Sequence, residues 1–304
     1  MKILHIIVLL LFTAAASVLF AESPADVVAA AAKGDLDAMF ELGSVAIEDG
    51  QYPEARSWFE KASAKDHAPS KAALGFMYFN GFACEKDLTK ARELYEQSAK
   101  AGSHDGLNNL AHLYRYGLAG LKQDLVKSVE LLEESAKKGN EYAVNTLSSM
   151  YRSNELGAPE LAKTMKWLKF GAERDNPGCL SDLGYAYEHG IGVEKNTANA
   201  IAYYKKAISS GSVSAQSNLG YLYLMGSGVV RDYDIALKLF AESASRGHVG
   251  GMINFAVMKY NGLGCECNPD EAFELLKKAN DQGNLQAGQM LNEWKAKEQG
   301  VQEK

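Results

Sequence analysis

This sequence contains little proline, no excess of basic over acidic residues and few long apolar runs. Only six of its 304 residues are proline, so few positions prevent a helix from continuing. Lys and Arg number 32 against 38 Asp and Glu, which gives a formal net charge of −6. A nucleic-acid partner requires a surplus of Lys and Arg to neutralise phosphates, so this balance argues against one. The 47% hydrophobic and 23% charged residues are those of a folded chain and exclude general disorder.

The one apolar run of spanning length stands at the N-terminus. Lys2 is followed by the apolar segment 3–20, and small residues lead to Ala21. This order predicts a signal peptide over 1–21 with cleavage after Ala21, or an earlier cut near Ala16. The segment is also about long enough to cross a bilayer, so a retained anchor is the competing interpretation. We expect an exported chain, periplasmic or secreted, with no stable membrane insertion after cleavage.

Two markers recur along the rest of the chain in one register. The first is a small residue at Gly43, Gly75, Ala111, Ser148, Gly184, Gly220 and Ala256, with intervals of 32, 36, 37, 36, 36 and 36 residues. The second is a Gly or Asp at Gly34, Asp66, Gly102, Gly139, Asp175, Gly211, Gly247 and Gly283. A period of roughly 36 residues indicates about seven tandem helix–turn–helix repeats.

Each repeat is predicted to contain two helices, named helix A and helix B. Glycine inside a helix costs about 1 kcal/mol relative to alanine, so a position that is always Gly, Ala or Ser in helix A indicates close helix packing. Glycines at the end of helix A predict left-handed C-caps, at Gly81, Gly117, Gly190, Gly226 and Gly262. An Asp or Asn then predicts the N-cap of helix B, at Asp87, Asp124, Asn196, Asp232 and Asn268.

Helix B carries a small, a large and again a small residue, each one helical turn after the previous one. The small residue that opens the stripe is Ala55, Ala91, Ser128, Thr164, Ala200, Ala236 or Ala272. The large residue is Phe59, Tyr95, Leu132, Leu168, Tyr204, Phe240 or Leu276. Such a stripe predicts a packing seam against neighbouring helices. Repeat four departs from the pattern, because residues 152–160 lack the glycine pair and the capping Asp.

This pattern resembles the Sel1-like repeat, a relative of the tetratricopeptide repeat. The shared unit is Ala-x-x-x-Leu-Gly-x-x-Tyr-x-x-Gly, a loop ending in Asp, then Ala-x-x-x-aromatic-x-x-Ala and a closing Gly; residues 215–247 fit it nearly throughout. The resemblance covers roughly residues 26–298. It implies an all-α solenoid, a right-handed superhelix of helix–turn–helix repeats, in which helix A lines a concave face that takes up peptides or protein surfaces. It implies no single function, because such arrays serve many partners.

The predicted organisation is a signal peptide, one solenoid over residues 22–298 and a polar tail over 299–304. The repeats are expected at about 24–66, 67–102, 103–139, 140–175, 176–211, 212–247 and 248–283. A capping helix over 284–298 then shields the last repeat from water.

One sequence motif raises the possibility of catalysis. Ser135-Ala-Lys-Lys138 matches the Ser-x-x-Lys nucleophile motif, and some secreted relatives have been described as β-lactamases. Ser135 nevertheless occupies a small-residue packing position of helix B, and neither Ser-Asp-Asn nor Lys-Thr-Gly accompanies it. The glycine pairs follow helices rather than strands, so they are not dinucleotide sites. We predict no catalytic residue, no cofactor and no metal.

The four cysteines, Cys84, Cys179, Cys265 and Cys267, are separated by the repeat register. Cys84 and Cys265 hold the same loop position five repeats apart. With helices ~8–10 Å apart, they exceed the ~4.4–6.8 Å between Cα atoms that a disulfide needs. Cys179 is also too far from Cys267, and a Cys265–Cys267 bridge would be strained. We predict no stable intramolecular disulfide; a metal or redox role for Cys265-Glu-Cys267 is the alternative.

By analogy with the tetratricopeptide relative, the exposed side of helix A is the predicted binding groove. The candidate residues are Phe76, Phe79, Asn108, His112, Arg115, Tyr116, Asn145, Arg152, Tyr185, Glu188, His189, Ser217, Tyr221, Leu224 and Tyr260. Aromatic residues interleaved with Arg, Asn and His are typical of interface hot spots. The competing interpretation is that several tyrosines pack between repeats.

Three functional hypotheses follow. The first is an exported, non-enzymatic scaffold or adaptor that binds a protein or peptide in the groove. The second is a secreted hydrolase acting on β-lactam or cell-wall substrates. The third is a secreted effector or adhesin acting on a host protein.

Overall fold

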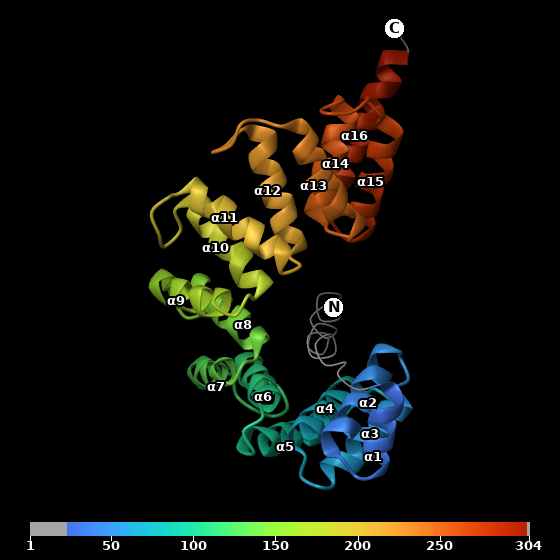
Figure 1. The fold of residues 1–304 in the computed structure, drawn as a ribbon, viewed down its shortest axis with the longest axis vertical. Helices are drawn as coiled ribbons and strands as arrows, with labels where there is room; N and C mark the ends of the chain where they lie inside the picture. The colour runs from blue at the N-terminus through green and yellow to red at the C-terminus, as the bar shows by residue number, and fades with distance from the viewer. Residues whose placement is uncertain (1–22, 303–304) are drawn as a thin grey trace. The chain divides into compact units, whose positions relative to one another are not determined.

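A computed structural model describes residues 23–302, and these residues form sixteen α-helices and no strand (Figure 1). The chain divides into two compact units, one ending at Gly157 and one beginning at Ala158. The predicted signal peptide lies outside the described residues. Within residues 23–302, no helix combines the length and the apolar character needed to cross a bilayer.

The first unit contains helices α1 to α8. Their bounds are α1 (Pro24–Ala32), α2 (Leu36–Glu48), α3 (Tyr52–Ser63), α4 (Ala68–Asn80), α5 (Leu88–Lys100), α6 (His104–Tyr116), α7 (Leu125–Lys137) and α8 (Glu141–Arg152). The even-numbered helices are the predicted helices A, and α3, α5 and α7 are helices B. Each helix packs against the next one along the chain, and α4 also contacts α6. The extra helix α1 is held by buried Val27 and Ala31 against Ala62.

The second unit contains helices α9 to α16. Their bounds are α9 (Leu161–Ala172), α10 (Pro177–His189), α11 (Thr197–Ser209), α12 (Val213–Met225), α13 (Tyr233–Ser245), α14 (Val249–Asn261), α15 (Pro269–Asp281) and α16 (Leu285–Gln302). The helices A, α10, α12 and α14, contact one another in succession. The predicted capping helix is α16, which packs on α15. The prediction of an all-α repeat fold is confirmed.

The predicted helix ends are present in the structure. Each of the five predicted N-cap side chains accepts a hydrogen bond from the backbone N–H three residues later. All five predicted C-cap glycines have positive φ, between 62° and 78°. Such residues satisfy backbone groups that the helix itself leaves unpaired. At α9, Glu160 makes no side-chain cap bond, in agreement with the irregular sequence there.

The small residue of helix A gives room to the large residue of helix B in the same repeat. A Cβ added at Gly184 would lie 2.5 Å from Cδ1 and Cε1 of the Tyr204 ring, and one at Gly75 would lie 2.8 Å from Cε1 of Tyr95. Gly43 faces Phe59 and Gly220 faces Phe240 in the same way. The predicted close packing of helices A and B is therefore confirmed.

The two positions vary together along the chain. Where helix A has Gly, helix B has an aromatic residue, at Gly43/Phe59, Gly75/Tyr95, Gly184/Tyr204 and Gly220/Phe240. Where helix A has Ala or Ser, helix B has Leu, at Ala111/Leu132, Ser148/Leu168 and Ala256/Leu276. Because protein interiors are close-packed, a methyl group on one helix and a ring on the other compete for one volume.

The loops between helix A and helix B have a second residue with positive φ. It is glycine at Gly192, Gly228 and Gly264, and alanine at Ala83 and Ala119. The two alanine carbonyls accept hydrogen bonds from Arg56 and Arg92 of the preceding helix B, at 2.8 and 3.0 Å. The loops with glycine instead approach the start of the preceding helix B.

Candidate protein-binding site

The fifteen predicted groove residues differ widely in exposure. The exposed ones are Tyr116, Asn145, Arg152, Tyr185, His189 and Tyr221. Partly buried ones are Phe79, His112, Arg115, Glu188, Leu224 and Tyr260. The buried ones are Phe76, Asn108 and Ser217.

The three buried residues are occupied inside the array. Phe76 packs edge-on against Phe82, with ring centroids 5.8 Å apart. The Nδ2 of Asn108 lies 3.5 Å from Oδ1 of Asn109, and Ser217 Oγ accepts from Asn254 at 3.4 Å. A helix A packs on neighbours along most of its circumference, so these positions offer no surface to a partner.

In the first unit, helices α4 and α6 form a small aromatic cluster. The Phe79 and His112 ring centroids are 6.1 Å apart, and those of His112 and Tyr116 are 4.7 Å apart. Burial lowers the pKa of His112 to about 4, and the nearby Arg115 charge acts in the same direction. His112 is therefore neutral at neutral pH. The charges next to the cluster are those of Lys86, 5.5 Å from the Phe79 ring centroid, and Arg115, 5.1 Å from that of Tyr116, and Tyr116 is the most exposed member.

Arg115 has a structural role in this unit. Its Nε and Nη2 donate to the two carboxylate oxygens of Glu155 at 2.7 and 2.6 Å. Its carbonyl accepts from Gln123 at 2.9 Å. A bidentate pair of this kind fixes both groups, so the guanidinium holds the irregular segment after α8 and is already engaged.

In the second unit, helices α10 and α12 carry a surface that we name the tyrosine patch: Tyr185, His189, Tyr221 and Met225. Tyr185 is 43% exposed and Tyr221 is 46% exposed. They occupy equivalent positions of adjacent repeats, on helices that contact each other. The Tyr185 and His189 rings stack with centroids 4.1 Å apart.

Met225, 52% exposed, was absent from the sequence prediction. It lies one turn after Tyr221 on the same face, and that spacing could have identified it. Helix α12 contains no Asp, Glu, Lys or Arg between Val213 and Met225. The part of the tyrosine patch on α12, Tyr221 and Met225, therefore comes from an uncharged helix, whereas His189 on α10 lies 3.9 Å from the Glu188 carboxylate.

Two further predicted residues make contacts within the array. Glu188 accepts a hydrogen bond of 2.6 Å from the Tyr204 hydroxyl, and burial together with this bond raises the pKa of Tyr204. The Tyr260 ring stacks on Trp294 of α16 at 4.1 Å, and its hydroxyl donates to Glu298 at 3.1 Å. Tyr260 thus packs between the last repeat and the capping helix.

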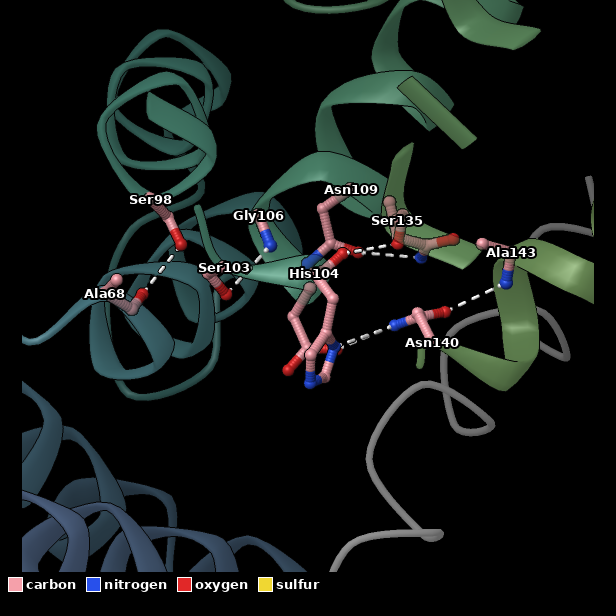
Figure 2. A network of polar contacts seen from close by, with 11 residues as sticks. Ala68, Ser98, Ser103, His104, Gly106, Asn109, Ser135, Asn140 and Ala143 are labelled. Carbon is pink, nitrogen blue, oxygen red and sulfur yellow. Dashed lines mark hydrogen bonds and ion pairs between the residues drawn. The ribbon is translucent and has the colours of Figure 1, made fainter. Parts of the chain in front are cut away.

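The candidate nucleophile Ser135 is a buried packing residue. Figure 2 shows its hydroxyl donating to the carbonyl of His104, the first residue of α6, at 2.6 Å. Ser98 bonds Ala68, the first residue of α4, in the same way at 2.7 Å. Ser243 repeats the contact with Val213 of α12 at 3.1 Å. The predicted packing role of Ser135 is confirmed, because three repeats use this serine to join helix B to the helix A before it.

The same close-up shows how α8 is attached to α6. Asn140 caps α8 by accepting from the Ala143 N–H (Figure 2). Its Nδ2 donates to Asp105 of α6 at 2.9 Å. Asp105 also accepts from His104 and thereby raises the pKa of that imidazole. This network is a joint between repeats, built from groups that satisfy one another.

The cysteines are thiols with local roles. Cys84 and Cys265 donate weakly to carbonyls of the preceding helix A, Met77 at 3.6 Å and Met258 at 3.9 Å. Cys267 contacts the Tyr260 carbonyl at 3.0 Å. Residues 23–302 contain no cluster of three His, Cys, Asp or Glu suited to a metal. The absence of a disulfide in solution stays a prediction.

Tandem pairs of helices, with exposed tyrosines on helices α6, α10 and α12, define an α-helical repeat scaffold of the kind that binds proteins. The chain belongs to the Sel1 repeat family, which matches it at residues 36–67, 68–103, 104–140, 177–212, 213–248 and 250–284. Between the third and fourth of these matches, the segment 141–176 has no match, and it contains the irregular loop.

Solved structures of other repeat proteins are similar to the chain. A Sel1 repeat protein from Oxalobacter formigenes has a TM-score of 0.68 and 25% identity, over 78% of this chain and 94% of that one. A protective antigen of uropathogenic Escherichia coli with an SLR fold has a TM-score of 0.67 and 27% identity, over 89% of this chain and 58% of that one.

One curated relative, an exopolysaccharide production negative regulator of Rhizobium leguminosarum bv. viciae, is 32% identical over 92 residues. The match covers 27% of this chain and 34% of the regulator. The chain thus matches about a third of the regulator and under two thirds of the E. coli antigen.

Proposed function

We propose that this chain is an exported, non-enzymatic scaffold that binds a segment of another protein on the tyrosine patch of α10 and α12. The observation that supports it is the pair Tyr185 and Tyr221, exposed at equivalent positions of adjacent repeats. Tyrosine provides large contact area at low entropic cost and is enriched at binding hot spots. An extended segment that crosses these two repeats can contact Tyr185 in one and Tyr221 in the next.

The hydrolase hypothesis has less support. Its one candidate nucleophile, Ser135, has a fully buried hydroxyl that is committed to the His104 carbonyl. A nucleophile needs an adjacent base and access to substrate. Hydrolysis of nitrocefin by the purified chain, lost in Ser135→Ala, would revive this hypothesis against the scaffold. An effector or adhesin role differs from the first proposal only in the identity of the partner.

We expect Tyr185→Ala/Tyr221→Ala/Met225→Ala to weaken partner binding at least about tenfold, because truncating hot-spot residues costs ~1–2 kcal/mol or more each. The partner would first be identified by cross-linking and pull-down from envelope extract. Its affinity for wild type and variant would then be measured with purified proteins, and circular dichroism would check that helicity is unchanged.

A matched control is available on other surfaces. Val126→Ala/Val230→Ala removes side chains that are 73% and 88% exposed and that are not members of the tyrosine patch. Binding should stay within about twofold of wild type, since surface truncations outside a hot spot contribute little. Equal affinity for the patch variant and the wild type would refute the proposed site.

Export is a separate part of the proposal, and it rests on the basic start and apolar segment 3–20. We expect the chain recovered from the periplasm or medium of a Gram-negative host to begin at Glu22, because cleavage follows Ala21. Intact-mass spectrometry of the recovered chain shows whether it begins at Glu22. Recovery of the uncleaved chain from the membrane fraction would favour the anchor instead.

A further inference from the structure

Two adjacent helices B of the second unit carry positive charge alone, in a chain whose net charge is −6. Helix α9 contains Lys163, Lys166 and Lys169, and α11 contains Lys205 and Lys206. Neither helix contains Asp or Glu within its bounds. We name this surface the basic face.

The repeat itself does not require lysine at these positions. The residues that occupy the register of Lys166 in α5 and α7 are Glu93 and Glu130. Those in the register of Lys169 in α3, α5 and α7 are Glu60, Glu96 and Glu133. Because the repeat packs with glutamate at these positions in some helices B and with lysine in others, packing does not fix the sign of the charge. The replacement of glutamate by lysine in α9 and α11 is therefore a property of this surface.

Contacts join the two helices at their C-terminal ends. Lys206 donates to the carbonyl of Ala172, the last residue of α9, at 3.4 Å and to Asp175 at 2.8 Å. Helix α10 packs against both α9 and α11, and the three labels lie together in Figure 1. The lysines therefore belong to one continuous surface of the second unit.

Two of the five lysines are already neutralised. Lys206 pairs with Asp175, and Lys163 pairs with Glu160 at 2.7 Å. Lys166, Lys169 and Lys205 are exposed, and none of them forms an ion pair among the described residues. Three unopposed like charges on one surface favour an anionic partner.

We propose that the basic face binds an acidic protein segment rich in Asp or Glu. The exposed apolar side chains of the two helices are mostly alanines, Ala162, Ala198 and Ala202, which are too small to insert into lipid; the larger Leu161 is 37% exposed, at the first position of α9. Trp167, the large aromatic residue of α9, is buried and offers no ring for base stacking. Lysine acts as a mobile point charge rather than a rigid fork, so it suits flexible carboxylates. This surface lies on helices B, apart from the tyrosine patch.

The test measures, by fluorescence anisotropy, how tightly the purified chain binds two labelled peptides of equal length. One peptide consists of ten glutamates and the other of ten glutamines. We expect the glutamate peptide to bind at least about tenfold tighter, and salt raised from about 50 to about 300 mM to weaken it several-fold by screening. Lys166→Glu/Lys169→Glu/Lys205→Glu should reduce the affinity by at least about tenfold, because attraction becomes repulsion.

The chain offers a control with the same change in net charge. Lys238 has the register of Lys166, and Lys277 and Lys278 of α15 have the registers of Lys205 and Lys206. Their surroundings are acidic: Asp234, Asp270, Glu271, Glu274 and Asp281. Lys238→Glu/Lys277→Glu/Lys278→Glu should keep the affinity within about threefold, because only the overall charge changes. The tyrosine-patch variant should also keep it.

Three results would overturn the proposal: equal binding of the two peptides, equal loss in the basic-face and control variants, or wild-type affinity in the basic-face variant. Binding of the chain to vesicles containing phosphatidylglycerol is measured in parallel. Binding to these vesicles without binding to the glutamate peptide would assign the face to a membrane and contradict an acidic protein segment. Unchanged helicity in circular dichroism shows that each variant is folded.

Discussion

Gly43→Ala is expected to lower the free energy of unfolding by up to about 2 kcal/mol, although alanine is the better helix former. The substitution should gain about 1 kcal/mol from helix propensity. Its Cβ, however, would lie 2.8 Å from Cδ1 and Cζ of Phe59, a fully buried ring. Forcing extra volume into a packed core costs about 1–3 kcal/mol or more, and here the obstacle is the body of a ring rather than a flexible end.

The chain itself indicates the compensating change. Ala256 faces Leu276 where Gly43 faces Phe59, and both members of the alanine–leucine pair are buried in one core cluster. We therefore expect Gly43→Ala/Phe59→Leu to be less destabilised than the sum of its single variants, with a coupling of about 1 kcal/mol or more. Urea unfolding followed by circular dichroism gives the global values, and amide exchange in α2 and α3 gives the local ones.

Ala256→Gly is the control for this cycle. With Leu276 opposite, no ring needs the space, so the variant should lose about 1 kcal/mol of helix propensity and the core contacts of one methyl group. Strict additivity of Gly43→Ala and Phe59→Leu would show that the two positions do not share a volume, and the covariation along the chain would need another cause.

The repeat register, the caps and the glycine positions could all be predicted from the sequence, since each depends on residues within one period. Asp87, for example, caps α5 through a backbone group three residues away, and such local chemistry is visible in any single repeat. Because the same capping and packing contacts recur in successive repeats, each repeat supports the prediction made for the others. Helix α1 was not separated from the first repeat, although Ser23 and Asp26 form a capping box there.

The candidate site was predicted less well, because exposure depends on neighbouring repeats. Phe76 and Tyr185 hold equivalent positions, yet Phe76 is buried and Tyr185 is exposed. Phe82, in the loop after α4, packs against Phe76, and the periodic pattern does not specify that contact. The Arg115–Glu155 pair joins residues 40 positions apart, and Glu155 lies in an irregular loop. No sequence motif therefore predicts this pair. Met225 occupies the register of Tyr116 and His189, but a prediction based on aromatic and polar side chains does not include a thioether.

Gly264→Ala should lower the free energy of unfolding by about 2–5 kcal/mol. Gly264 has φ 70°, a conformation that costs an L-residue about 1–2 kcal/mol. A Cβ there would also lie 2.9 Å from the Tyr233 carbonyl oxygen and 3.0 Å from its carbon. Backbone at the start of α13 cannot move aside without disturbing the Asp232 cap, so crowding adds about 1–3 kcal/mol.

Two further variants separate the dihedral cost from the crowding cost. Gly247→Ala has φ 85° and nothing within 4 Å of an added Cβ, so it should lose only the dihedral contribution, about 1–2 kcal/mol. Ala83→Gly acts in reverse at φ 52°: relief of the dihedral offsets the greater freedom of the unfolded chain, and stability should change by less than about 1 kcal/mol. Thermal unfolding of the three variants gives the comparison. If Gly264→Ala lost no more stability than Gly247→Ala, contact with α13 would not be the reason for glycine at this loop position, and the φ angle alone would suffice.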